Sequence, residues 1–205
     1  MPRREPDLKR RQLLDAALGE FSRSGLAGTP VDVIARRAGC SPGLIYRYFE
    51  SKSGLFEAVF EEIAQSTVES SPLDALDLAE YAVRLHDAGE ARPDVNRFLA
   101  WYELEHVGEG QTPSGPESFF RQKITEISAA QVAGQVRNDV PAVEVAIVIQ
   151  TLARLWATSA GVVRVVADPA GNAAFRRHVV KAAVSDYLAA GQRSQDQPDE
   201  AKSGR

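Results

Sequence analysis

The sequence predicts an all-α protein of about nine helices, in which a three-helix N-terminal domain with a helix-turn-helix precedes a larger helical C-terminal domain. Apolar residues recur at helical spacing in almost every segment, and no segment sustains the alternation that is typical of a strand. Helix starts are indicated by a capping residue followed by proline, which the first helical position tolerates. The four such pairs are Thr29-Pro30, Ser41-Pro42, Ser71-Pro72 and Asp168-Pro169.

The expected helices follow one another with short connections, and glycines mark several of their ends. The predicted helices cover residues 7–23, 30–38, 42–49, 52–69, 72–88, 93–107, 116–136, 141–166 and 169–190. We expect residues 1–51 to form the N-terminal domain and residues 52–191 the C-terminal domain. The remainder, 192–205, is polar without a large apolar residue and is predicted to be disordered.

Composition indicates a globular chain with a core of its own. The 205 residues are 44% hydrophobic and 25% charged, and no membrane-spanning apolar run or secretory signal is visible. The single cysteine, Cys40, excludes an internal disulfide framework and favours a reducing compartment, so we expect a cytoplasmic protein. Residues 1–60 carry ten basic and seven acidic side chains, a net charge of +3, whereas the rest carries −7. This asymmetry favours contact of the first segment with a polyanion, although chance also produces so small an excess.

The segment between Thr29 and Lys52 has the pattern of two short helices joined by a tight turn. We expect Thr29 to cap the first helix, with Asp32 reaching back to it. A small residue, Ala35, permits a close helix crossing, and Gly39 supplies the turn. We expect Ser41 to cap the second helix, which begins at Pro42 and whose residues at 45 and 49 face inward. This arrangement is typical of a helix-turn-helix that places its second helix in the major groove of DNA.

The same segment resembles the TetR family of repressors over roughly residues 8–60. The motif that carries the resemblance is Ile34-Ala35 … Ala38-Gly39 … Ser41 … Gly43 … Tyr46 … Tyr48-Phe49 … Ser51-Lys52. The resemblance implies a dimeric all-α transcriptional regulator that binds operator DNA and senses a small molecule in its C-terminal domain. The sequence departs from the family pattern at Leu44, where a hydroxylated residue is common, and at Cys40, where valine is common. Leu44 favours an apolar contact with DNA, and Cys40 is expected to be a small buried hydrophobe.

The resemblance also implies which residues face DNA. The expected phosphate contacts are Thr29, Tyr46, Tyr48 and Lys52. The residues that are expected to come within reach of base edges are Pro42, Gly43, Leu44 and Arg47. Arg47 could hydrogen-bond either a guanine base or a phosphate. The alternative for Tyr48 is that its side chain packs partly in the core. The basic residues Lys9, Arg10 and Arg11 are interpreted as a solvated face with an auxiliary backbone contact as the alternative.

The predicted helix 141–166 is apolar on nearly every face. Such a helix must be covered on all sides, and a second subunit is the natural cover for one of them. One helix-turn-helix covers only a half-site of DNA, so two-fold symmetry favours a dimer over a monomer with a buried central helix. The resemblance implies a homodimer that pairs the helices at 141–166 and 169–190.

Several aromatic and polar residues of the C-terminal part are candidates for a ligand site, which combines an apolar lining with a few polar groups. The candidates are Tyr81, His86, Phe98, Trp101, Tyr102, Glu105, Phe120 and Arg154. Core packing is the competing interpretation for each aromatic residue. Arg154 fits either an interfacial ion pair or a charge that faces the ligand.

The catalytic motifs that we searched for do not occur, so we expect no enzyme, no cofactor and no metal. A Glu-x-x-His pair at Glu103 and His106 is one half of the pattern that a di-iron bundle needs, and the other half is missing. A helical-bundle enzyme is therefore the weaker second hypothesis, which a metal assay would decide. A third hypothesis is a DNA-binding protein without a ligand, acting through protein partners.

Overall fold

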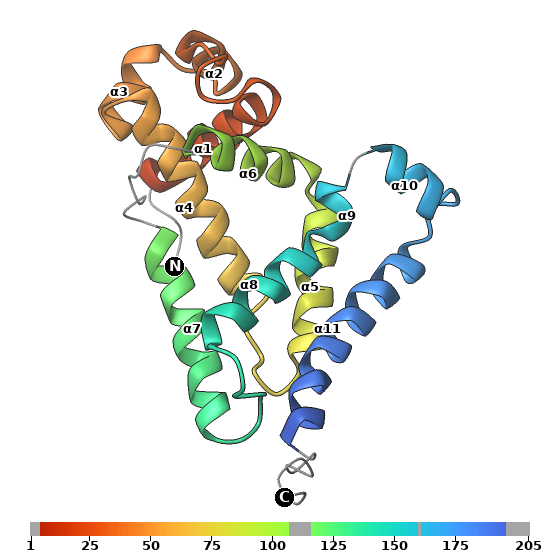
Figure 1. The fold of residues 1–205 in the computed structure, drawn as a ribbon. Coiled ribbons are helices and arrows are strands. Elements are labelled where there is room, and N and C mark those ends of the chain that lie inside the picture. Colours follow the sequence, from red (N-terminus) through yellow and green to blue (C-terminus); the bar gives the residue numbers. More distant parts are fainter. Residues whose placement is uncertain (1–4, 107–115, 160, 196–205) are drawn as a thin grey trace, which may run out of the picture. The chain divides into compact units, whose positions relative to one another are not determined.

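The computed structural model describes residues 5–106, 116–159 and 161–195, and every regular element in these ranges is a helix, which confirms the predicted all-α class (Figure 1). The chain forms two compact units, each built from two separate stretches. Unit 1 contains residues 1–70 and 92–119, and unit 2 contains residues 71–91 and 120–205. The functional division that we expect after residue 51 falls inside unit 1.

Unit 1 is assembled around its first helix. Its helices are α1 (Glu5–Ser24), α2 (Val31–Arg37), α3 (Pro42–Phe49), α4 (Lys52–Ser70) and α6 (Pro93–His106). Helix α1 packs against α2, α4 and α6, and α3 packs against α2 and α4 (Figure 1). The ring of Phe56 lies between those of Phe21 and Phe98, with centroids 5.0 and 4.8 Å away. Helix α6 therefore completes the core under the helix-turn-helix, although it is far from it in sequence.

Unit 2 has a core formed by three helices that pack against one another. Its helices are α5 (Leu78–Ala91), most of α7 (Pro116–Val132), α8 (Ala142–Ala153), α9 (Leu155–Thr158), α10 (Gly161–Ala167) and α11 (Ala173–Gln195). Helices α5, α8 and α11 are in mutual contact (Figure 1). Tyr81 of α5, Val145 of α8 and Val180 of α11 are almost fully buried in this core.

The single helix that we expect over 141–166 is wrong, because the structure divides this stretch into α8, α9 and α10. The backbone leaves the helical conformation at Ser159, with ψ at 138°. The Ser159 hydroxyl donates to Leu155 O at 2.6 Å, and the Thr158 hydroxyl donates to Arg154 O at 3.0 Å. Such local side-chain bonds compete with the helical backbone pattern. Apolar periodicity does not register this competition, so the count of about nine helices was too low.

Two of the four proline pairs do not begin a helix. Helix α5 begins after Asp77, whose carboxylate accepts the Glu80 N–H at 2.9 Å. Helix α11 begins after Asn172, whose side-chain oxygen accepts the Phe175 N–H at 3.1 Å. These N-caps lie downstream of the prolines at 72 and 169, because a side chain that accepts an orphan N–H stabilises a helix start more directly than proline does.

The C-terminal helix is longer than expected. Helix α11 continues to Gln195, into the segment 192–205 that the sequence predicts to be disordered, and the rest of that segment lies outside the described residues. Helix α7 ends at Val132 rather than near residue 136. Across the described part of the chain, none of the helices combines the length and the hydropathy that a membrane crossing requires.

Candidate DNA-binding interface and buried polar residues

The turn between α2 and α3 has the geometry that the sequence predicts. Gly39 adopts a φ of 61°, a left-handed conformation that glycine tolerates. The Cys40 N–H donates to Ala35 O at 3.0 Å, which closes the turn. Ile34 of α2 and Ile45 of α3 are fully buried, so one face of each helix is fixed against the core of unit 1. The opposite face of α3 is therefore held outward by packing.

That outward face carries most of the residues that we expect to face DNA. Gly43, Tyr46 and Arg47 are exposed, and Pro42 and Leu44 are partly exposed. A Cβ atom at Gly43 would meet no other atom within 4 Å, so the backbone is open to an approaching surface at this point. Tyr48 is half-buried against the core, which agrees with its partial place there.

Thr29 does not lie as predicted. Its side chain is 2% exposed, and its hydroxyl donates to Gly25 O at 2.7 Å. Pro30 occupies the N-cap of α2, and no side chain caps this helix. The predicted capping box is wrong because Thr29 turns inward to bond the end of α1. This placement gives no support to a phosphate contact through the Thr29 hydroxyl.

Lys52, the first residue of α4, lies beside the same loop. Its Nζ donates to Thr29 O at 3.3 Å and is 3.5 Å from Ala27 O. The start of α4 is capped by the residue before Lys52, since the Gly54 N–H donates to Ser51 Oγ at 2.9 Å. Lys52 therefore holds the loop before α2 against the start of α4 while its amine remains near the surface.

The three basic residues at the start of α1 contact unit 1 itself. Lys9 Nζ donates to Ala38 O at 3.1 Å, at the end of α2. The Arg10 guanidinium lies 5.6 Å from the ring centroid of Phe49, and both Arg10 and Arg11 face Glu62, at 3.8 and 3.5 Å. Such exposed ion pairs contribute at most about 1 kcal/mol each. These contacts favour the solvated-face interpretation.

The candidate ligand residues are divided between the two units. Phe98, Trp101, Tyr102 and Glu105 belong to unit 1, and Tyr81, His86, Phe120 and Arg154 belong to unit 2. Phe98 and Tyr102 are core residues of unit 1, with 0% and 6% exposure. Glu105 accepts the Leu26 N–H at 3.2 Å, after the end of α1. For these residues the structure supports packing and bracing roles.

A polar cluster that sequence reasoning missed joins α4 to α6. Both oxygens of Glu57 are used: Oε2 accepts the Tyr102 hydroxyl at 2.7 Å, and Oε1 lies 3.1 Å from His106 Nε2. The other ring nitrogen of His106 lies 2.7 Å from Tyr102 O. Burial, followed by the bond to Glu57, raises the pKa of Tyr102 well above its usual value. The i, i+4 spacing of Tyr102 and His106 was the available signal, but nothing in it pointed to Glu57.

His106 Nε2 thus lies against Glu57, a residue outside the Glu-x-x-His pair. Among the residues that the structure describes, no group of three or more histidine, cysteine, aspartate or glutamate side chains could hold a metal ion.

Unit 2 contains buried polar atoms without a hydrogen-bond partner. The Tyr81 hydroxyl and the Trp156 Nε1 are two such atoms. Burial and the nearby Glu126 carboxylate raise the pKa of Tyr81 to about 12. Lys123 Nζ lies 5.8 Å from the Tyr81 ring centroid, and burial lowers the pKa of this amine. Lys123 gave no signal in the sequence, because one lysine on an amphipathic helix is ordinary.

The remaining candidates of unit 2 take different positions. His86 is buried, and its Nδ1 lies 3.3 Å from Ala153 O at the end of α8. Arg154 separates α8 from α9, and Phe120 packs partly buried against the core. A buried donor without a partner costs free energy, so the Tyr81 hydroxyl and the Trp156 Nε1 destabilise this unit as it stands.

Helices α2 and α3 are joined by a fixed turn, and the outward face of α3 lies on a partly basic surface. These features define the class of this protein as a helix-turn-helix DNA-binding regulator. Residues 13–59 match the family model described as "Bacterial regulatory proteins, tetR family". Residues 77–185, more than half of the chain, match "Tetracyclin repressor-like, C-terminal domain". The chain belongs to the TetR family of transcriptional regulators.

Individual relatives agree with this membership. The HTH-type transcriptional repressor SCO4008 of Streptomyces coelicolor is 30% identical over 159 residues, which cover 77% of this chain and 82% of the relative. The solved structure of the transcriptional regulator SCO4942 from Streptomyces coelicolor is 31% identical, with a TM-score of 0.76 over 88% of this chain and 98% of the other. FadR from Bacillus subtilis, solved in complex with stearoyl-CoA, shares the fold at 18% identity, with a TM-score of 0.63 over 85% of this chain and 97% of its own.

Proposed function

We propose that this TetR-family regulator is a repressor that binds a palindromic operator as a homodimer and is released by a small-molecule effector. The observation that carries the proposal is the outward face of α3, where Gly43, Tyr46 and Arg47 are exposed while Ile45 and Phe49 anchor the helix. A helix held in this way fits the major groove. The protein would act by binding alone, without catalysis, in the cytoplasm where it meets operator DNA.

Apolar residues left exposed in unit 2 support the homodimer. Val143 and Ile147 lie one turn apart on α8 and are 40% and 51% exposed, and α10 carries four further exposed valines. Contiguous exposed apolar surface is typical of a protein–protein interface. We propose that α8 and α11 pair with their symmetry mates, as the sequence leads us to expect, and that a second subunit covers these side chains.

The effector would bind in unit 2. The unpartnered donors of Tyr81 and Trp156 support this site, because a ligand with hydrogen-bond acceptors would remove the cost of burying them. Arg84 Cζ and Lys123 Nζ each lie 5.8 Å from the Tyr81 ring centroid and add positive charge, with Glu126 as the opposing carboxylate. By linkage, an effector that weakens operator binding must itself bind less tightly to the DNA complex.

The test is selection of random DNA duplexes by the purified full chain, followed by fluorescence anisotropy on the enriched sequence. The proposal expects a palindromic sequence, bound by two protomers. Metabolites that raise the melting temperature of the protein would then be added, and at least one should release the DNA. Tyr81→Phe should keep operator affinity but weaken this release. Enrichment of no sequence would refute the operator, and a stabilising compound that never affects DNA binding would refute the effector role.

A further inference from the structure

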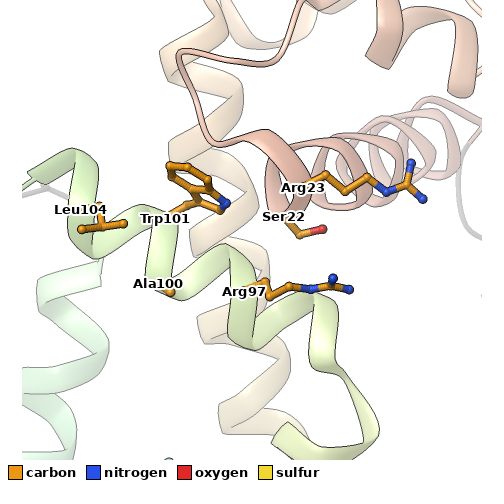
Figure 2. Close-up of a pocket in the computed structure, with 6 residues that line it drawn as sticks. All are labelled: Ser22, Arg23, Arg97, Ala100, Trp101 and Leu104. Atoms are coloured by element: carbon orange, nitrogen blue, oxygen red, sulfur yellow. The ribbon is translucent and has the colours of Figure 1, made fainter. Parts of the chain in front are cut away.

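A cavity of about 330 Å³ lies between α1 and α6 within unit 1, apart from the effector site proposed above (Figure 2). Cavities of about 150 Å³ can hold a benzene molecule, so this one has room for a substituted ring. Its volume is at the lower end of the range for ligand sites. The residues that line it are Ser22, Arg23, Arg97, Ala100, Trp101 and Leu104.

The lining divides into an apolar part and a basic part. Residues 97, 100, 101 and 104 have the spacing i, i+3, i+4 and i+7, so they form one stripe of α6. Figure 2 shows the indole of Trp101 on one side, and the side chains of Arg23 of α1 and Arg97 of α6 extending in the same direction on the other. The Ser22 hydroxyl is already used, since it donates to Gly19 O at 3.2 Å.

Positive charge around the cavity exceeds the negative charge available to neutralise it. Glu20 pairs with both Arg23, at 3.3 Å, and Arg37, at 2.7 Å. Arg97 forms no ion pair or hydrogen bond with the described part of the chain. Two acids of α6 are already used: Asp94 pairs with Arg92, and Glu105 accepts the Leu26 N–H. Of the two arginines that line the cavity, Arg23 therefore shares its one carboxylate with Arg37, and Arg97 has no carboxylate partner in the described part of the chain.

The indole of Trp101 packs against the backbone of unit 1. A Cβ atom on Gly25 would lie 2.7 Å from Trp101 Cε3, so the ring lies directly against the backbone. Gly25 has a φ of 67°, and it forms the turn that follows α1. This turn packs against one side of the ring, and Trp101 also lines the cavity, where an aromatic ring favours stacking of a planar molecule.

We propose that this cavity binds a small aromatic carboxylate, with its ring against Trp101 and its carboxylate between Arg23 and Arg97. Guanidinium groups match carboxylates in geometry as well as charge. The ligand would contact α1 and α6 together, next to the turn that leads into α2. The site is therefore a second binding site, in the unit that contains the helix-turn-helix, and it does not depend on the effector role of unit 2.

Tryptophan fluorescence offers a direct test, because the chain has two tryptophans and Trp156→Phe leaves only Trp101. Benzoate should change the emission of this variant along a saturable curve. Benzamide, which keeps the ring without the charge, and acetate, which keeps the charge without the ring, should not. Arg97→Gln or Arg23→Gln should weaken benzoate about threefold to fivefold, since each removes a charged hydrogen-bond donor at an exposed position. The matched control is Arg11→Gln, an exposed arginine of the same α1, which should bind benzoate unchanged.

Because Trp156 is buried, calorimetric titration of benzoate into the unsubstituted chain and its Arg97→Gln variant provides a second measurement. Arg97 is exposed, so this variant is expected to fold. Equal affinity in these two proteins, or equal binding of benzamide and benzoate to the unsubstituted chain, would overturn the proposal. Neither measurement involves DNA, so failure here leaves the operator proposal standing, and failure of operator binding leaves this site standing.

Discussion

The hydroxyl oxygen of Tyr102 lies 2.7 Å from Oε2 of Glu57, so a charged hydrogen bond joins α6 to α4 within unit 1. The same carboxylate reaches His106 with its other oxygen. The Tyr102 ring stacks on Phe56 at a centroid distance of 5.6 Å. The polar bond and the aromatic contact together hold α6 in the core beneath the helix-turn-helix.

Tyr102→Phe removes the bond and keeps the ring. We expect a loss of about 1 kcal/mol in the free energy of unfolding, because Glu57 keeps partial access to water and recovers some solvation. Urea denaturation measures the change. Tyr46→Phe, at an exposed position of α3, is the matched control and should change stability by less than about 0.5 kcal/mol. Equal effects of the two substitutions would show that the bond to Glu57 contributes nothing.

Alkaline pH should destabilise the protein through two tyrosines whose pKa values are raised. Tyr81 and Tyr187 have pKa values raised from 10.0 to about 12, in each case chiefly by burial. Between these values the unfolded chain has lost protons that the folded chain retains, so stability is full below pH 10 and falls as the pH rises toward about 12. The lowered pKa of Lys123 makes stability rise with pH instead. Lys123 is present in every variant compared, so its effect cancels in the comparison. Tyr81→Phe should flatten the decline in urea denaturation between pH 9.5 and 11.5, and an unchanged slope would contradict the raised pKa.

Gly43→Glu should abolish operator binding without damage to the fold. Open space surrounds the position of the new Cβ atom, so the free protein accommodates it. The side chain would hold α3 away from DNA and bring a carboxylate near phosphates. We expect at least a hundredfold loss of affinity by anisotropy, with an unchanged melting temperature. Ser66→Glu, which adds the same charge on exposed α4, should bind normally, and full affinity in Gly43→Glu would disprove the proposed placement of α3.

Lys52→Ala should reduce the salt dependence of operator binding. If a dimer makes roughly 6–10 phosphate contacts, affinity should fall about 10³–10⁵-fold between 50 and 200 mM salt. Loss of one contact per subunit lowers the slope of log K against log salt by about 2. Lys181→Ala in unit 2, where Lys181 pairs with Glu80, is the control. An unchanged slope would show that Lys52 makes no phosphate contact and serves only to hold the loop before α2.

Ile147→Asp should split the dimer. The side chain is half-exposed in one protomer, so the substitution spares the core, but it would bury an unpaired charge in the proposed interface at a cost of several kcal/mol. Light scattering should give a monomer at micromolar concentrations. Ser128→Asp, on the exposed face of α7, should remain dimeric. A monomeric unsubstituted protein would contradict both the interface and the palindromic operator.

The sequence predicts best where one local pattern determines the structure. The α3 boundaries, the turn at Gly39 and the inward faces of Ile45 and Phe49 all follow from patterns within one continuous segment, although the Ser41 side chain forms no capping bond. The inward turn of Thr29 depends instead on Gly25 O, which accepts its hydroxyl in preference to the capping geometry.

Contacts between segments that are far apart in the sequence cannot be predicted from local patterns. Phe98 and Tyr102 look like pocket aromatics in sequence, since nothing local indicates that Phe56 faces them across the unit. The cavity beside Trp101 shows the same limitation: its two arginines are far apart in the chain, and only folding brings them to one site.

The contribution of α6 to unit 1 has a consequence for the order in which the chain can fold during synthesis. A nascent chain that ends at Ser70 already contains the whole helix-turn-helix, but Phe21 and Phe56 still lack the cover that Phe98 supplies. All of α5, which belongs to unit 2, must be made before α6 follows. The DNA-reading helices therefore reach their final stability only after residues 71–91 of unit 2 and then α6 have been synthesised. An isolated fragment of residues 1–70 should expose an aromatic surface and aggregate.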